Sequence, residues 1–230
     1  MFPLHDDNPT ETIPYVTIAL IAICTLVFFW QLSLGSYAQQ AVVSLGFIPA
    51  TLFDGKSLPT NLEIIPAWMT IFTSMFMHGG WMHIIGNMLY LWIFGNNVED
   101  SMGHARFIGF YLLCGIIAVA AHSLPDPAST TPLIGASGAL AGVLGAYLLL
   151  YPHAKVLVAI PFGFFIHTMR LPAGLVLGFW FILQIFNSAS AGDQAGGIAW
   201  GAHIGGFIAG MALIPVFKYK KVKLFSSEIR

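Results

Sequence analysis

The sequence has 230 residues, of which 57% are hydrophobic and only 8% are charged. Soluble domains carry about 25% charged residues, so this composition excludes an ordinary water-exposed surface and predicts a protein that crosses a membrane several times. The formal net charge of −1 gives no support for nucleic acid as a partner. Cys24 and Cys114 lie inside apolar runs, which favours small buried side chains over a disulfide framework or a metal site.

Six apolar segments approach the length of about 20 residues that a helix needs to cross a membrane. They are residues 13–34, 80–94, 105–121, 137–151, 172–186 and 197–217. Pro14 and Pro172 suit first helical turns, and Gly95 is typical of a stop signal after the second segment. The basic region of a secretory signal peptide is missing before the first segment, so we expect that segment to be retained as a helix.

Two further apolar segments are not expected to span the membrane. Residues 64–77 are too few and contain Pro66, a pattern typical of a segment that lies in the membrane interface. Residues 156–169 are interrupted by Pro161 and Gly163, and they predict a loop that lies along the membrane surface.

Lysine and arginine predict the orientation. Six spans place both ends of the chain on one side, together with Arg106, Lys155, Arg170, Lys218, Lys220, Lys221, Lys223 and Arg230. Positive charge accumulates on the cytoplasmic side, so we expect this side to be the cytoplasm and only Lys56 to lie outside. The predicted organisation is a short cytoplasmic segment (1–12), one membrane domain (13–217) and a basic cytoplasmic tail (218–230). Outer loops are then expected at 35–79, 122–136 and 187–196.

Ser137 begins the fourth segment, inside the stretch GASG. Pro152 limits this helix to about 15 residues, or roughly 22 Å, whereas the hydrocarbon core is about 30 Å thick. A helix that ends at the cytoplasmic face then begins roughly 8 Å below the outer surface. Lipid cannot satisfy the free N–H groups there, so we expect a water-filled cavity open to the outside, with Ser137 at its floor.

His203 lies at a matching depth, roughly 9 Å below the outer surface if the sixth helix begins near Gly197. Small residues follow Ser137 and His203 on the same helix faces, namely Ala141, Gly145, Gly206 and Gly210. Two such faces let helix backbones approach closely, so we expect these helices to touch with Ser137 and His203 side by side. A nucleophile with its base is one interpretation. Simple packing, with a histidine that bonds a neighbouring helix, is the other.

Carboxylates are missing from this predicted depth. The four nearest candidates lie at the cytoplasmic end of the second segment or in outer loops: Glu99, Asp100, Asp126 and Asp193. A serine protease here would use a Ser–His dyad. His83 and Asn87 lie one turn apart on the second segment, where Asn87 and the Ser137 backbone N–H are suitable donors to an oxyanion. The alternative is that His83 and Asn87 only bond neighbouring helices.

Four stretches resemble the rhomboid family of intramembrane serine proteases. In chain order they are HGGWMHIIGN, VEDSMGHARFIGFYLLCG, GASG and GAHIGGFIAG, all between Trp68 and Gly210. The resemblance implies an all-α, polytopic bundle of six transmembrane helices, with a membrane-lying outer loop between the first two. It also implies that residues 172–186 form a lateral gate.

The resemblance assigns roles to several residues. It implies that Ser137 is the nucleophile and that His203 acts first as general base and then as acid. His83, Asn87 and the Ser137 N–H would form the oxyanion hole. Two residues, His78 and Gly135, would support the site. Substrates would be single-span membrane proteins cut near the outer face, commonly after small residues. The resemblance implies no cofactor and no metal.

The sequence departs from some family members at Ala141, where they carry an aromatic residue that contacts the histidine. The orientation of His203 must then come from elsewhere, for example from Trp200. A metalloprotease built on the histidines would lack the H-E-x-x-H signature and a carboxylate at the right depth. A transporter would be expected to show broken helices or an internal repeat.

The main alternative is a catalytically inactive rhomboid-like protein that binds client transmembrane helices, although such a protein would be expected to have lost Ser137 or His203. The compact six-helix form with short ends favours the bacterial inner membrane as its location.

Overall fold

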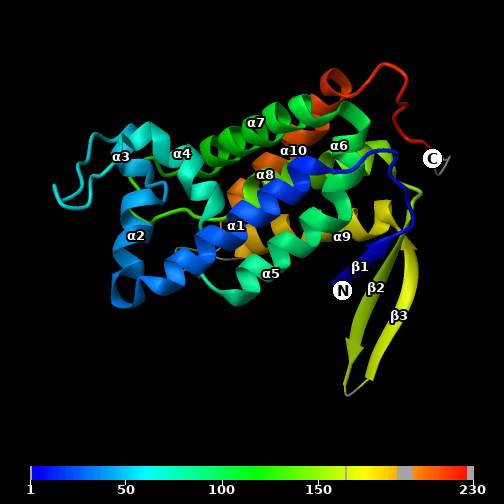
Figure 1. The fold of residues 1–230 in the computed structure, drawn as a ribbon, viewed down its shortest axis with the longest axis horizontal. Coiled ribbons are helices and arrows are strands. Elements are labelled where there is room, and N and C mark those ends of the chain that lie inside the picture. The colour runs from blue at the N-terminus through cyan, green and yellow to red at the C-terminus, as the bar shows by residue number, and fades with distance from the viewer. Residues whose placement is uncertain (1, 164, 191–198, 227–230) are drawn as a thin grey trace.

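The computed structural model describes residues 2–163, 165–190 and 199–226. Most of this part of the chain is helical, and the long helices pack side by side (Figure 1). Four described helices are long and apolar enough to cross a membrane: α1 (Tyr15–Ser33), α7 (His104–Ser123), α9 (Ala173–Ser190) and α10 (Trp200–Phe217). The chain is therefore an integral membrane protein. Gly197, Asp193 and Arg230, which entered the sequence predictions, lie outside the described residues.

The second predicted helix is longer than expected. α5 (Trp81–Tyr90) continues through a π-helical turn, η4 (Leu91–Gly95), into α6 (Asn96–Met102). The prediction that Gly95 stops this helix is wrong. A Cβ atom at Gly95 would lie 3.1 Å from Oγ1 of Thr17 on α1. The glycine therefore permits the close approach of α1.

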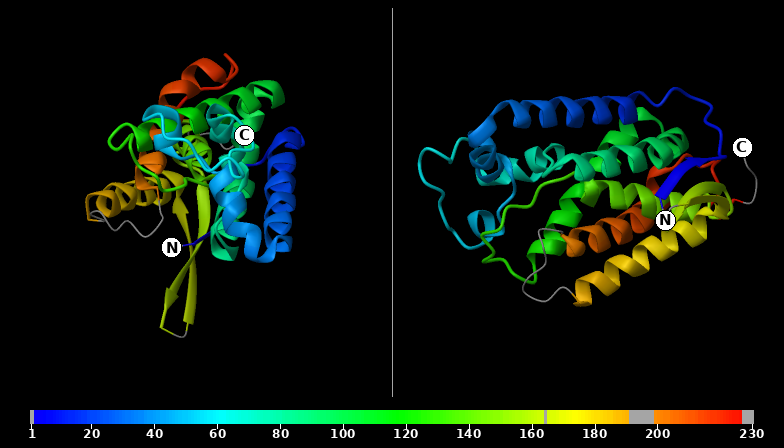
Figure 2. Two further views of the ribbon diagram at one scale, coloured as in Figure 1. Left: turned by 90° about the vertical axis from the view of Figure 1, so that its left-hand side faces the viewer. Right: turned by 90° about the horizontal axis from the view of Figure 1, so that it is seen from below.

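α8 (Ser137–Leu150) occupies the centre of the bundle and contacts α7, α9 and α10 (Figure 2). Its 14 residues span about 21 Å, less than the hydrocarbon thickness of about 30 Å. A methyl group at Gly206 or Gly210 of α10 would overlap backbone atoms of Gly138 or Gly142 on α8. The predicted contact between two small-residue helix faces is confirmed.

Short helical turns form the end of the bundle opposite the chain ends (Figure 1). They are η1 (Gly35–Tyr37), α2 (Ala38–Leu45), α3 (Pro49–Phe53), η2 (Ala67–Met69), α4 (Thr70–Thr73) and η3 (Ser74–Phe76). Residues 64–77, expected to be too short to span, contain the last three. Phe47 and Leu133 exchange backbone hydrogen bonds of 3.0 and 2.7 Å, which fixes the loop that leads into α8.

A small antiparallel sheet corrects the all-α prediction. Its strands lie in the order β1 (Phe2–Asp6), β2 (Lys155–Phe162) and β3 (Phe165–Pro172). Residues 156–169, predicted as a loop, form most of the β2–β3 hairpin. Pro161 and Gly163, which were expected to interrupt this segment, are both compatible with the hairpin.

Gly163 has a φ of +58° in the turn between the strands. Pro161 lies on the part of β2 that extends beyond its pairing with β1, where its missing N–H is tolerated on that edge. β1 also ties the expected N-terminal tail to the sheet.

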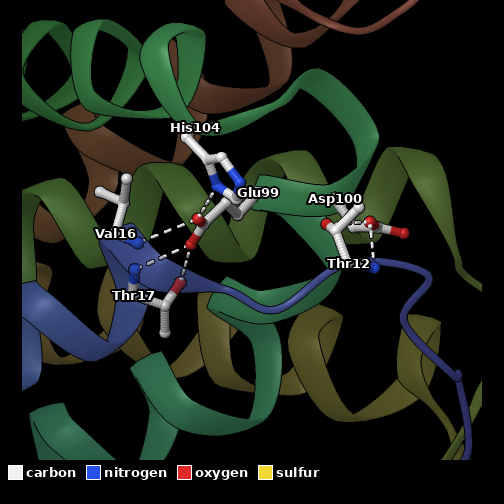
Figure 3. Close-up of polar contacts among 6 residues, drawn as sticks. All are labelled: Thr12, Val16, Thr17, Glu99, Asp100 and His104. Carbon is white, nitrogen blue, oxygen red and sulfur yellow. Dashed lines mark hydrogen bonds and ion pairs between the residues drawn. The ribbon is translucent and has the colours of Figure 1, made fainter.

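Two neighbouring carboxylates hold the start of α1 (Figure 3). The fully buried Glu99 accepts hydrogen bonds from the backbone N–H of Thr17 (2.8 Å) and from its hydroxyl (2.7 Å), and it lies 2.5 Å from Nδ1 of His104. Asp100 accepts a 2.5 Å bond from the hydroxyl of Thr12. N–H groups in a first helical turn have no partner within the helix, so Glu99 caps α1 from a distant part of the chain.

Candidate active site

Ser137 is the first residue of α8, and the loop before it is held in one conformation. The backbone N–H of Gly135 donates a 2.8 Å bond to the carbonyl of Ser74. Gly135 has a φ of +126°, which L-residues with a side chain rarely adopt. This turn leads directly into α8, and Ser137 at the first helical position is partly exposed.

His203 on α10 lies beside Ser137. Its Nε2 is 2.8 Å from the Oγ of Ser137, a hydrogen-bond distance. For this contact to form, the first turns of α8 and α10 must lie close together. The small residues on the facing sides of the two helices permit this approach. The structure thus brings together the two residues that the sequence predicted as a pair.

Gln184 on α9 bonds the other side of the same imidazole. Its Nε2 donates to the carbonyl of Trp180 at 3.0 Å, so its Oε1 is the atom that faces Nδ1 of His203 at 2.8 Å. An amide oxygen only accepts, so Nδ1 carries the proton. Nε2 then has a free lone pair, and the hydroxyl of Ser137 donates to it.

Sequence reasoning missed Gln184. Its signal was present: it is the only amide side chain in the apolar run 172–186, and it is buried. Polar residues inside a membrane helix are functional candidates. The expected orienting contact from Trp200 is present as an edge-on ring contact at 6.0 Å, and Trp180 lies at 5.9 Å on another side. Gln184 contacts His203 through a hydrogen bond, whereas Ala141 has only a methyl group and provides no aromatic contact.

His83 on α5 reaches the same site. The backbone N–H of Gly79 donates a 3.3 Å bond to Nδ1 of His83, so in the neutral ring Nε2 carries the proton. This Nε2 lies against Gly135, where an added Cβ would be 2.7 Å from it and 3.6 Å from the Oγ of Ser137. His83 therefore presents an N–H donor close to the serine, and Gly135 leaves room for it.

Asn87 and His78 are buried polar residues near His83. Asn87 is one helical turn further along α5, and its Nδ2 has no hydrogen-bond partner in the part of the chain that the structure describes. His78 packs edge-on against His83 at 5.1 Å between ring centroids, and Gln31 on α1 accepts a 3.0 Å bond from its backbone N–H. Burial lowers the pKa of His78 to about 4, so its ring is neutral at pH 7.

A small pocket opens beside Ser137. Its lining includes small residues from three helices, namely Gly115, Ala118, Gly138, Ala139 and Ala202. Among the described residues, no three His, Cys, Asp or Glu side chains lie together as a ligand set for a metal ion. The geometry offers a hydroxyl, a base, an N–H donor and a narrow pocket in one place.

Comparison with known proteins identifies a family for this chain. The model of the rhomboid domain matches residues 66–220, which include all the site residues described above except Gln31. Rhomboid protein 1, mitochondrial, of Saccharomyces cerevisiae is 32% identical over 164 residues, 69% of this chain and 44% of that protein. Rhomboid protease GluP of Bacillus subtilis is 31% identical over 194 residues, 84% of this chain and 35% of that protein.

A plant relative, Rhomboid-like protein 11, chloroplastic, of Arabidopsis thaliana, is 28% identical over 159 residues, 65% of this chain and 52% of that protein. The chain thus spans between about a third and about half of the length of these three curated relatives. The domain match covers well over half of the chain. This chain belongs to the rhomboid family.

Proposed function

We propose that the protein is an intramembrane serine endopeptidase that hydrolyses a peptide bond in or near the transmembrane segment of a single-span membrane protein. The observation that carries this proposal is the chain of hydrogen bonds from Ser137 through His203 to Gln184. A serine hydroxyl becomes a nucleophile when a base accepts its proton and a third group orients that base. Packing alone requires neither of these two bonds.

The first chemical step joins Ser137 to the substrate. Nε2 of His203 takes the hydroxyl proton while Oγ attacks the peptide carbonyl carbon, giving a tetrahedral oxyanion. The oxyanion collapses, the C–N bond breaks, and Nε2–H returns its proton to the leaving amine. A water molecule then releases the acyl group from Ser137 by the same two proton transfers.

Donors for the oxyanion come from two helices. We assign this role to Nε2–H of His83, the amide of Asn87 and the backbone N–H of Ser137. A buried amide without a partner costs about 1–3 kcal/mol, and such a donor is ready for charge that appears only in the transition state. His78 and Gly135 support His83, by ring contact and by leaving space. The small residues of the pocket fit a small side chain before the cut.

We also propose the predicted six-span topology. The unbroken run from α5 to α6 and the short α8 complete the four longer helices. Both described chain ends lie at one end of the bundle (Figure 1). Positive charge concentrates there, which supports a cytoplasmic position for it. A bacterial inner (plasma) membrane is our proposed location; the relatives include a Bacillus protein as well as a mitochondrial and a chloroplastic protein.

Cleavage of a single-span reporter in proteoliposomes tests the proposal. The reporter carries small residues at the outer end of its helix and a tag at each end. We expect two fragments with the wild type and none with Ser137→Ala or His203→Ala. Binding of the reporter without cleavage by the folded wild type would contradict the proposal and favour the client-binding alternative.

A further inference from the structure

The β2–β3 hairpin has two chemically different faces. Residues directly opposite each other in an antiparallel pair point to the same side, and neighbours along a strand point to opposite sides. One side, here called the apolar face, therefore holds four opposed pairs: Val156 with Leu171, Val158 with Met169, Ile160 with His167, and Phe162 with Phe165. All of these residues but His167 are apolar. The opposite face is mixed, and its polar or charged members are Lys155, Thr168 and Arg170. Its other residues are Leu157, Ala159, Pro161, Ile166 and Pro172.

The apolar face begins inside the protein and ends outside it. Val156 and Val158 are fully buried in the hydrophobic core, whereas Phe162 is 80% exposed and Phe165 is 78% exposed. Exposure of two large aromatic side chains to water is unfavourable. The stripe that packs on the helices at the base of the hairpin thus continues to the tip, where none of the described residues covers it.

The direction of this face follows from its base. Val156 and Val158 point into the helix bundle, so the rest of the apolar face is turned toward the layer that the helices occupy. The hairpin projects sideways from the bundle, at the end where the chain ends lie (Figures 1 and 2). It therefore lies beside the helix ends and extends along the surface of the membrane that they cross.

The helix that follows the hairpin shows at which membrane depth the base of the hairpin lies. α9 begins at Ala173, directly after β3, and it exposes an apolar stripe at Leu175, Phe179 and Ile182. In a helix long and apolar enough to span, such a stripe faces lipid. The base of the hairpin is thus level with the first turn of a lipid-facing helix.

Charge near the hairpin fits a lipid headgroup layer. Arg170 and Lys155 lie on the face turned away from the helices. Four lysines follow α10 at the same end: Lys218, Lys220, Lys221 and Lys223. Basic residues close to an anionic membrane surface are attracted to it. The part of the hairpin nearest the bundle is therefore amphipathic, with an apolar inner face and two basic side chains on its outer face.

We propose that the β2–β3 hairpin is a membrane-lying arm whose apolar face inserts into the headgroup and acyl boundary of the leaflet on the side of the chain ends. Its occupant is the lipid bilayer itself, and its tip contacts are Phe162 and Phe165. The arm enlarges the footprint of the protein on one leaflet and fixes the level of the first turn of α9. This inference depends on the membrane-spanning fold and is independent of any catalytic activity.

Spin labels along the hairpin test the proposal. Single substitutions place a label on the apolar face (Phe162→Cys, Phe165→Cys, Met169→Cys) or on the opposite face (Pro161→Cys, Thr168→Cys, Arg170→Cys). The full chain is reconstituted in vesicles of phosphatidylcholine and phosphatidylglycerol in equal parts. Both native cysteines are buried, so the wild type reports background labelling. Collision rates with oxygen, which concentrates in lipid, and with a water-soluble nickel chelate are measured at each position.

We expect the ratio of oxygen to chelate accessibility to alternate with a period of two, high on the apolar face and low on the other. Equal chelate access on both faces near the tip would overturn the proposal, because the hairpin would then lie in water. Spin–spin broadening that disappears when labelled protein is diluted with unlabelled protein would also overturn it, in favour of a second copy of the chain. In Phe162→Ser/Phe165→Ser, a label at position 169 should become accessible to the chelate.

Discussion

Gln184→Leu removes the acceptor for Nδ1–H of His203 while keeping a side chain of similar size. The proton on Nδ1 then has no partner, or it moves to Nε2, where it blocks the acceptance of the Ser137 proton. Each outcome lowers the reactivity of Ser137, although Gln184 touches neither the serine nor the substrate. We therefore propose Gln184 as a positioning residue. It lies on a different helix from both Ser137 and His203.

The size of the effect follows from the bond that is lost. A buried donor without a partner costs about 1–3 kcal/mol, and 1.4 kcal/mol is a factor of ten in rate. We therefore expect Ser137 to react about 5-fold to about 150-fold more slowly. The upper bound is near 10⁴-fold, the loss that a wrong imidazole tautomer causes in Ser–His–Asp enzymes.

The assay is the second-order rate constant for labelling by a fluorophosphonate, which requires no knowledge of the substrate. Gln184→Glu keeps an acceptor and should retain most of the rate. Ile185→Ala, at the neighbouring exposed position, is the matched control for damage to α9. With a cleavable reporter, kcat should fall and KM should stay the same. Labelling of folded Gln184→Leu at the wild-type rate would refute the orienting role.

Three further predictions concern stability and the loop beside the serine. Glu99→Gln should lower the melting temperature in detergent more than Thr17→Val does. The glutamine amide brings N–H donors close to the groups of Thr17 that donate hydrogen bonds to the carboxylate. Equal shifts in melting temperature would argue against the capping role of Glu99. Burial raises the pKa of Asp6 from 3.8 to about 6, so protonation of Asp6 stabilises the folded state. This contribution to the free energy of unfolding is fully present below about pH 4 and is lost as the pH rises through about 6. Asp6→Asn should remove this slope from melting curves, and an unchanged slope would point to another group. Gly135→Ala should abolish labelling in a folded protein, since its Cβ would meet His83, whereas Gly86→Ala, with open space around it, should label normally.

The proximity of Ser137 and His203 could be predicted from the sequence because its signals are local. Short helices and glycine spacing follow from residue size and span length, and they are enough to place Ser137 and His203 at one depth. The contact between α8 and α10 then follows from close packing of small residues. No comparable signal pairs Gln184 with His203, because the rotation of α9 about its axis depends on the packing of the whole bundle.

The β2–β3 hairpin and the role of Gly95 were predicted wrongly because local sequence patterns allow more than one structure. Pro161 and Gly163 break helices, and this property alone does not separate a loop from a hairpin with a glycine turn. The alternation of apolar residues from Val156 to Phe162 was the available signal for a strand. Gly95 resembles a helix stop, but its role depends on Thr17, which is distant in the sequence and close only in the fold.

The most direct test of the central claim is labelling of the purified protein by a fluorophosphonate serine-hydrolase probe, with the modified residue identified by mass spectrometry. We expect the wild type to be labelled on Ser137, and we expect no labelling of Ser137→Ala or His203→Ala. Equal labelling of all three proteins would show that the reactive group lies elsewhere. A folded wild type that remains unlabelled in lipid bilayers would contradict the claim that His203 activates Ser137.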